Sequence, residues 1–236
     1  MNINPGFLII NKPIGISSYG CISYIKRILK QKIKIGHAGT LDPFASGILI
    51  VALGRQATRL IDRVMMMEKT YVATGKCGEL TDTLDHTGVV TFTSAYIIAE
   101  QEICSSLASF GSSYTQTPPF YSALKYQGSP LYTLTRQNVM SEEQLQEIVV
   151  SKRRIVQLYD VQLLSYNSPF FTIQARVSHG TYIRTLINDI AVRAGSCATT
   201  YQLIRTAVGP FNLNQAVDLA SLKTIDDINR GILPNL

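Results

Sequence analysis

The sequence has no tryptophan and only three histidines, and its four cysteines lie far apart without a Cys-x-x-Cys pair. This spacing argues against a zinc site and against a small disulfide scaffold. The chain also has no Gly-x-Gly-x-x-Gly or Walker phosphate loop, and none of its histidines lies in a nucleophile-elbow context. We therefore expect no metal, no nucleotide cofactor and no Ser-His-Asp hydrolase.

Long apolar runs are missing too. No segment approaches the roughly 20 apolar residues of a membrane span, and the N-terminus lacks the basic-then-apolar layout of a secretory signal. We expect a cytoplasmic protein without a membrane partner. Its 236 residues, 46% of them hydrophobic and 16% charged, suffice for a globular core. A net charge of +6 and a pI near 9.1 favour an anionic partner such as nucleic acid.

Strand and helix patterns mix along the chain without a regular βαβ alternation. Apolar runs predict strands at Phe7–Ile10 and Ile48–Leu53, the second buried on both faces. Further strands are expected over 68–74, 89–92, 155–159, 161–166, 170–178 and 199–208. Helices are expected from Ser17 or Ser18, over 56–67, from Ser94, over about 131–137, from Ile183 and over 221–231. We expect an α+β fold whose central mixed, largely antiparallel sheet is flanked by helices and loops, in one domain of residues 1–236.

The stretch from Gly36 to Ser46 is where we expect the chemistry. Its glycines permit close ligand approach, and Pro43 biases Asp42 toward an extended or turn conformation. Because the buried strand follows at once, we expect Asp42 to lie beside the core in a stiff loop. A Gly-rich Asp-Pro turn alone is common structural punctuation, so these residues by themselves leave a purely structural loop open.

Five cations, Lys26, Arg27, Lys30, Lys32 and Lys34, cluster at the end of the first helix and just past it. Cations near a helix C-terminus complement its dipole and usually form a solvated face. Five within nine residues also suit a phosphate backbone. Both interpretations stay open.

Two segments have the composition of loops. The segment from Gly78 to Gly88 holds Asp82, Asp85 and three threonines without calcium-loop spacing, so we expect hydrogen-bond acceptors rather than metal ligands. The segment from Gly111 to Gly128 has no periodicity and interleaves aromatic side chains with Lys125. Exposed aromatic residues can stack on unpaired bases, which favours RNA binding.

The longer pattern Gly-His-x-Gly-Thr-Leu-Asp-Pro-x-Ala-x-Gly-x-Leu, from Gly36 to Leu49, resembles the catalytic motif of the bacterial TruB-type tRNA pseudouridine synthases. Five further motifs stand in the family's order: Asn11-Lys12-Pro13 with Gly15 and Ser17-Ser18, Glu68–Tyr71, Thr81–Asp85, Pro119 with Tyr121–Lys125 and Gly128, and Gly180–Arg184 followed by Leu203 and Arg205. Asn11 stands where the family more often has aspartate. The similarity covers roughly residues 6 to 215.

The resemblance implies the pseudouridine synthase fold and isomerisation of uridine 55 in the T-loop of tRNA, by a monomer without a cofactor. It implies Asp42 as the nucleophile, Arg184 as its ion-pair partner and Tyr71 as the ring that stacks on the target base. His37 is implied as the wedge that fills the space left by the extruded uridine. The other implied substrate-binding residues are Tyr182 and Leu203 as pocket walls, Lys12 and Asp85 as RNA contacts or supports of the site, and Lys125 in a thumb-like segment at about 112–150.

Many family members continue into a small C-terminal RNA-binding domain, which we expect to be absent here. Weaker tRNA binding with unchanged site selection would follow, so the T-arm stem-loop alone should suffice as substrate. Two alternatives remain open. One is a non-catalytic tRNA-folding chaperone, and the other is a related synthase that acts on a different RNA.

Overall fold

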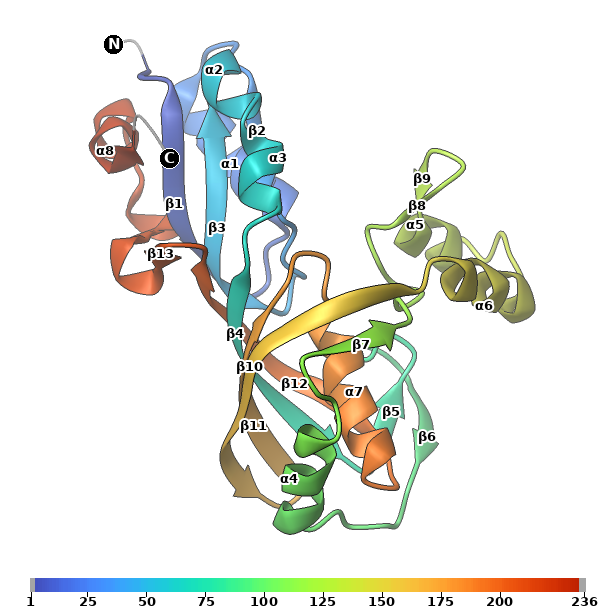
Figure 1. Ribbon diagram of the computed structural model, residues 1–236. Helices are drawn as coiled ribbons and strands as arrows, with labels where there is room; N and C mark the ends of the chain where they lie inside the picture. The colour runs from blue at the N-terminus through green and yellow to red at the C-terminus, as the bar shows by residue number, and fades with distance from the viewer. Residues whose placement is uncertain (1–2, 234–236) are drawn as a thin grey trace. The chain divides into compact units, whose positions relative to one another are not determined.

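The structure of the protein, a computed structural model, describes residues 3–233 (Figure 1). Backbone contacts divide the chain into two compact units. Unit 1 comprises the residues up to Tyr71 and those from Leu203 onward, and unit 2 comprises Val72–Gln202. Strands β4 (Lys69–Cys77) and β12 (Ala198–Val208) each have residues in both units. The single domain expected from the sequence stays a prediction.

Unit 1 is built on the pair β1 (Gly6–Lys12) and β3 (Ser46–Leu53), which run antiparallel side by side (Figure 1). Strand β2 (Ile35–Ala38) also pairs antiparallel with β3, whereas Ile204 and Arg205 of β12 pair in parallel with the start of β3. The smaller elements of this unit are β13 (Phe211–Asn212), β14 (Val217–Asp218), β15 (Ile232–Leu233), η1 (Leu213–Gln215), η2 (Leu219–Ser221) and α8 (Ile225–Gly231).

Both faces of β1 and β3 are covered. Alternate residues of the two strands pack against α1 (Ser18–Leu29), and the others pack against the short helices α2 (Gly54–Thr58) and α3 (Ile61–Met65). Each residue of 48–53 is at most 1% exposed, which confirms the predicted strand buried on both faces. Burying such a side chain contributes about 1.5–3 kcal/mol. The strand that follows the Asp42 loop is therefore a firm base for it.

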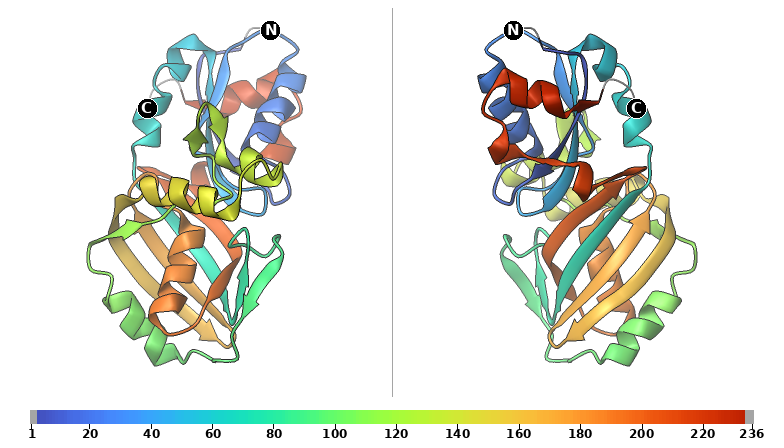
Figure 2. Two further views of the ribbon diagram at one scale, coloured as in Figure 1. Left: turned by 90° about the vertical axis from the view of Figure 1, so that its right-hand side faces the viewer. Right: turned by 90° about the vertical axis from the view of Figure 1, so that its left-hand side faces the viewer.

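Unit 2 contains a sheet in the order β12, β4, β11, β10, β7. Besides β4, β12 and the elements of the lobe described below, this unit contains β5 (Glu79–Thr81), β6 (Val90–Thr93), α4 (Glu100–Ala108), β7 (Ser113–Gln116), β10 (Arg154–Asn167), β11 (Phe170–Val177) and α7 (Ile183–Arg193). Helix α7 lies across one face of this sheet (Figure 2). A Cβ at Gly75 of β4 would come within 2.6 Å of Phe171 and 2.8 Å of Ile187, so this glycine lets α7 pack closely on the strands.

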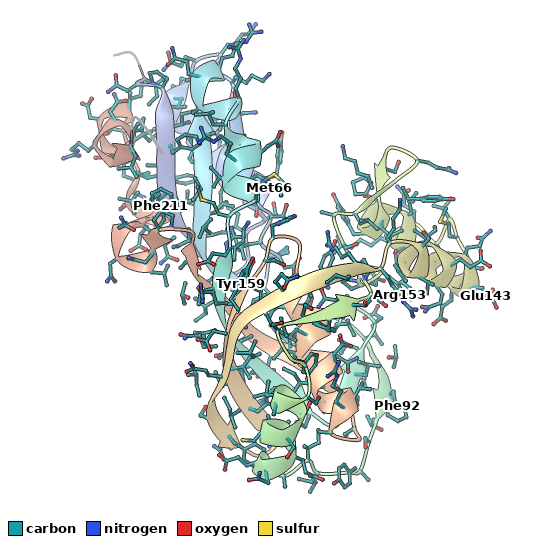
Figure 3. The ribbon with its side chains drawn as sticks, in the orientation of Figure 1. Met66, Phe92, Glu143, Arg153, Tyr159 and Phe211 are labelled. Carbon is teal, nitrogen blue, oxygen red and sulfur yellow. The ribbon has the colours of Figure 1, made fainter. Side chains whose placement is uncertain are left out.

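The thumb-like segment forms a small folded lobe of unit 2. It holds the hairpin β8 (Lys125–Tyr126) and β9 (Ser129–Pro130) and the helices α5 (Leu131–Arg136) and α6 (Glu142–Ser151), around a buried cluster of Leu131, Leu145, Ile148 and Val149. Arg153, labelled in Figure 3 between α6 and β10, donates from Nε to Thr117 Oγ1 at 3.0 Å. This bond ties the two ends of the lobe together.

The α+β class with a largely antiparallel sheet is confirmed, whereas several element boundaries were wrong. The predicted helix 56–67 is two helices, because the chain turns at Leu60, whose N–H bonds to the Ala57 carbonyl. The two strands predicted over 155–166 are one 14-residue strand, with one register shift between Leu158 and Asp160 and another between Leu163 and Ser165. Helix α4 begins only at Glu100, and α8 begins after its cap Thr224.

The described residues contain neither a membrane-spanning helix nor a metal-binding cluster of side chains. No helix within residues 3–233 is long and apolar enough to cross a membrane. Over the same range, no group of three or more His, Cys, Asp or Glu side chains gathers where it could hold a metal ion.

Candidate active site

Asp42 lies in a tight turn of unit 1, partly buried, between the left-handed Gly39 (φ +83°) and the strand β3. Its carbonyl accepts a hydrogen bond from the Ala45 N–H at 3.1 Å, which closes the turn. Pro43 within the turn restricts the backbone further. Asp42 therefore stands beside the core rather than on a loop in open solvent.

Residues of the first motif, over 11–18, are hydrogen-bonded to the Asp42 turn. Ser17 caps α1 by accepting from the Gly20 N–H, which leaves Ser18 for another task. Ser18 Oγ accepts from the Leu41 N–H at 2.8 Å and donates to the Leu41 carbonyl at 3.0 Å. The Gly15 N–H donates to the Pro43 carbonyl at 2.8 Å. The residues on both sides of Asp42 are thus bonded to the start of α1.

Lys12 supports the same turn from inside the protein. It is 0% exposed, and its Nζ donates to the carbonyls of Pro13 at 2.9 Å, Ile16 at 2.8 Å and Pro43 at 3.4 Å. Burial lowers its pKa from 10.5 to about 8, and the negative charge of Asp42 acts in the opposite direction. Of the two roles implied for Lys12, the placement fits a support of the site rather than an RNA contact.

Removing the Lys12 ammonium gives a stability test with a definite sign. Between pH 8 and 10.5 the unfolded chain holds a proton on Lys12 that the folded chain has lost, so stability rises with pH in this range. We expect the free energy of unfolding of the wild type, measured by denaturant titration, to rise relative to that of Lys12→Met as the pH increases across this window. The exposed Lys26→Met is the control and should run parallel to the wild type. Parallel curves for Lys12→Met as well would contradict the buried charge.

Arg205 binds the backbone before and after the turn. In the sequence it stood out only as part of a motif. It is 1% exposed, its Nε donates to the Ile48 carbonyl at 2.8 Å and its Nη2 to the Gly39 carbonyl at 3.1 Å. A Cβ at Gly47 would lie 2.2 Å from the Arg205 carbonyl oxygen. The glycine at 47 is therefore required by the close approach of β12. Glycines on either side of the turn were the signal in the sequence for this approach.

The other predicted residues of unit 1 lie on strands. His37 stands on β2 opposite Val51, and its Nδ1 is buried with no hydrogen-bond partner among the described residues. Burial, and secondly the charge of Arg205, lower the pKa of this imidazole, so it is neutral at neutral pH. Tyr71 on β4 is 8% exposed and Leu203 on β12 is 6% exposed. His37 is thus partly buried, and Tyr71 and Leu203 are buried.

In unit 2, the structure brings Arg184 and Asp85 together. Arg184 is 4% exposed; its Nη2 donates to the Tyr121 carbonyl at 2.7 Å, its Nη1 donates to the Thr83 carbonyl, and Nη1 lies 3.7 Å from Asp85 Oδ2. A guanidinium is a planar fork of donors, so contacts on several sides fix its orientation. Arg184 is therefore presented in one defined position.

Asp85 is itself fixed by the loop that carries it. Its Oδ1 accepts from Thr83 Oγ1 at 3.0 Å, from the Thr87 N–H at 3.0 Å and from Thr87 Oγ1 at 2.5 Å. The prediction that this loop supplies hydrogen-bond acceptors is confirmed. Since Asp85 is only 5% exposed, its placement fits a support for Arg184 rather than an RNA contact.

Tyr182 and Lys125 are the remaining predicted residues. Tyr182 is the N-cap residue of α7, partly buried, with the Arg154 guanidinium 5.0 Å from its ring centroid. Lys125 is exposed on the β8–β9 hairpin of the thumb. Their roles as pocket wall and thumb residue stay predictions.

The basic cluster at the end of α1 is exposed at all five positions. Within it, Lys26 Nζ lies 5.9 Å from the Tyr19 ring centroid and the Arg27 guanidinium 5.8 Å from that of Tyr24. Exposure fits both the solvated face and the phosphate contact, so RNA binding here stays a prediction.

A family model and curated relatives identify the family of this chain. A family model described as "TruB family pseudouridylate synthase (N terminal domain)" matches residues 26–183. The tRNA pseudouridine synthase B of Dehalococcoides mccartyi (strain CBDB1) is 40% identical, over 92% of this chain and 70% of its own length. That of Protochlamydia amoebophila (strain UWE25) is 36% identical, over 98% of this chain and 84% of its own.

Solved structures agree. A chain from the crystal structure of a Cbf5-Nop10-Gar1 complex is 28% identical with a TM-score of 0.69, covering 94% of this chain. One from the archaeal box H/ACA sRNP Nop10-Cbf5 complex is 26% identical with a TM-score of 0.68, covering 98%. The chain spans 54% and 60% of the length of these two solved chains. By motif order, fold and sequence identity, the chain belongs to the TruB family of pseudouridylate synthases.

Proposed function

We propose that the chain isomerises uridine 55 in the T-loop of tRNA to pseudouridine, with Asp42 as the nucleophile. The curated relatives are named for action on tRNA, which supports the substrate class. The observation that carries the proposal is the Asp42 turn, in which Ser18, Lys12 and Arg205 hold the backbone on both sides of a partly buried aspartate. A nucleophile held in one position spends little free energy on reorganisation during the reaction.

The reaction requires three changes in the uridine. The N1–C1′ bond breaks, the uracil rotates, and a C5–C1′ bond forms while C5 loses its proton and N1 gains one. A carboxylate promotes this exchange by attacking either the base or the sugar. The base must stay within the site after the N1–C1′ bond has broken and until the C5–C1′ bond forms. Tyr71, largely buried in this structure, is proposed to stack on the uracil and to take part in the proton transfer from C5.

Arg184 is proposed as the ion-pair partner of the Asp42 carboxylate. A guanidinium whose other donors already bind the carbonyls of Thr83 and Tyr121 meets a carboxylate without losing further side-chain freedom. The positive charge of a guanidinium stabilises a neighbouring carboxylate, which is the form in which an aspartate is a nucleophile. Asp85, bonded to Thr87 and close to Arg184, is proposed to hold the guanidinium in this orientation.

The target base must leave its stack before it can react, at a cost of a few kcal/mol. We propose that His37 fills the vacated space. A neutral imidazole, as the lowered pKa of His37 provides, stacks between bases without the desolvation cost of a charge. Tyr182 and Leu203 are proposed as walls of the base pocket, and the exposed Lys125 as a phosphate contact of the thumb. The monomeric state and the cytoplasmic location stay predictions.

RNA from cells that lack this chain tests the proposal. Mass-spectrometric mapping should find uridine at tRNA position 55, restored to pseudouridine by the wild-type chain and left unmodified by Asp42→Asn. If a uridine in another RNA lost its modification instead, the alternative of a related synthase that acts on a different RNA would be correct.

The T-arm stem-loop alone should be a full substrate, because the proposed contacts concern only the target base, its loop and the neighbouring backbone. We expect its single-turnover rate at saturating enzyme to lie within about threefold of that of full-length tRNA, with weaker binding from fewer phosphate contacts. A stem-loop that reacted far more slowly at saturation would show that contacts outside the T-arm assemble the site.

A further inference from the structure

Gln116, the last residue of β7, makes a paired contact with the backbone of Tyr182. Its Oε1 accepts from the Tyr182 N–H at 2.7 Å, and its Nε2 donates to the Tyr182 carbonyl at 3.0 Å. The side chain is 1% exposed, so water does not compete for these bonds. A primary amide that bonds both the N–H and the C=O of one residue copies a hydrogen-bonded residue pair of two antiparallel strands.

The orientation of this amide is fixed by a third bond. Nε2 also donates to Tyr114 Oη at 2.5 Å, and the Tyr114 hydroxyl is in turn hydrogen-bonded to Asp189 of α7. Both amide hydrogens and the amide oxygen are therefore used. Turning the amide over would set its NH₂ group against the Tyr182 N–H and its oxygen against the Tyr182 carbonyl. The network permits one arrangement only.

The backbone held in this way is the one that leads into Arg184. Tyr182 is the N-cap residue of α7 with extended backbone angles (φ −92°, ψ 110°), and its own side chain makes no capping bond. Gln116 supplies an acceptor for the Tyr182 N–H, whereas α7 uses the Tyr182 carbonyl, which accepts from the Leu186 N–H. Gln116 also stands directly before Thr117, where the thumb is closed by Arg153.

Resting on the proposed function, we infer that Gln116 is a positioning residue for the reaction: it fixes the Tyr182 backbone, and with it the Tyr182 ring and Arg184, to the base of the thumb. Gln116 lies among buried groups and acts through other residues rather than on the RNA itself. Its loss should lower the rate of the chemical step and leave RNA binding almost unchanged. Misplacing reacting groups by about 1 Å costs up to about 100-fold in rate.

Gln116→Met removes all three bonds while keeping the length of the side chain. We expect kcat to fall by about 10- to 100-fold and KM to change by less than about twofold, because RNA affinity comes mainly from phosphate contacts. Hydrogen exchange of the Tyr182 amide, followed by NMR, should become faster in the variant. A kcat within twofold of the wild type would overturn the inference, as would unchanged protection of the Tyr182 amide.

Gln116→Glu gives a second readout that simple destabilisation would not produce. A protonated carboxyl group can donate to the Tyr182 carbonyl and accept from its N–H as the amide does, whereas an ionised one faces that carbonyl with a negative charge. Because the site is buried, the variant carboxyl group should ionise well above its ordinary range. The activity of the variant relative to the wild type should therefore fall at least about fivefold between pH 6 and pH 8.

Other groups titrate or carry charge around this position, so each rate is compared with the wild type at the same pH. Tyr114 and Asp189 belong to the network, and Asp189 has a pKa raised by burial to about 6; Arg193 and Arg154 bring positive charge from α7 and β10. Gln157→Glu, the same change at an exposed position of β10 beside β7, is the matched control and should show a constant ratio. A constant ratio for Gln116→Glu would refute the inference, whereas a wild type that forms no pseudouridine would refute the proposed function instead.

Discussion

Asp42→Asn should abolish pseudouridine formation, with a single-turnover rate at least about 10⁴-fold below that of the wild type. An amide has the shape of the carboxylate but no nucleophilic oxygen. The turn itself is held through backbone groups, by Ser18 on Leu41 and by Lys12 and Gly15 on Pro43, so we expect it to keep its conformation. The affinity for tRNA, measured by filter binding, should stay within about threefold of the wild type.

Asp62→Asn is the matched control, since it makes the same chemical change on the exposed surface of α3 in the same unit. Its rate should equal that of the wild type. An Asp42→Asn rate within tenfold of the wild type would place the nucleophile elsewhere. If the variant bound tRNA and formed no pseudouridine but still restored every defect of cells without the chain, the non-catalytic chaperone role would be the important one.

Arg184→Met should have the second-largest effect and should act on both stability and activity. It leaves Asp85 buried without its cation and deprives the carbonyls of Thr83 and Tyr121 of a donor. Breaking a buried pair in this way costs about 3–5 kcal/mol of unfolding free energy. We also expect kcat to fall by about 10²–10³-fold in the protein that remains folded, because a charge-stabilising group is lost from the proposed site.

A surface pair provides the control. Arg230 and Asp227 of α8 also form an ion pair, but their side chains are 77% and 22% exposed, against 5% and 7% for Arg184 and Asp85. Arg230→Met should therefore change neither the denaturant midpoint nor kcat measurably. If Arg184→Met were as stable and as active as Arg230→Met, the assignment of Arg184 would be wrong.

A double-mutant cycle separates positioning from charge. If Asp85 acts through Arg184, then Asp85→Asn should lower kcat in the wild type and have almost no further effect in Arg184→Met. Additive losses would mean that the two residues serve the reaction independently. Arg184→Lys sharpens the comparison, since it keeps the charge but lacks the planar fork that reaches several acceptors.

The Asp42 turn could be foreseen from the sequence because its causes are local. Gly39, Pro43 and the apolar run of β3 restrict the backbone within a few residues of the carboxylate. The hydrogen-bonding role of the Thr81–Asp85 loop was foreseeable for the same reason. Short-range backbone chemistry and binary patterning are what a single sequence carries most directly.

The supporting roles of Arg205 and Gln116 could not be foreseen, because they depend on contacts between distant parts of the chain. Arg205 reaches the Ile48 carbonyl across 157 positions, and Gln116 reaches Tyr182 across 66. For Lys12 the family resemblance left open an RNA contact or a support of the site, and its full burial against the carbonyls of its own motif favours the support. Only the packing of β1, β3 and β12 reveals that a charged side chain belongs to the interior.

Tritium release from a tRNA transcript tests the central claim most directly. With tritium at C5 of every uridine, each new C5–C1′ bond frees one tritium into water. The purified chain should release one tritium per tRNA, none when position 55 is cytidine, and none as Asp42→Asn. Release that is indifferent to the base at position 55, or that continues without the Asp42 carboxylate, would contradict the account.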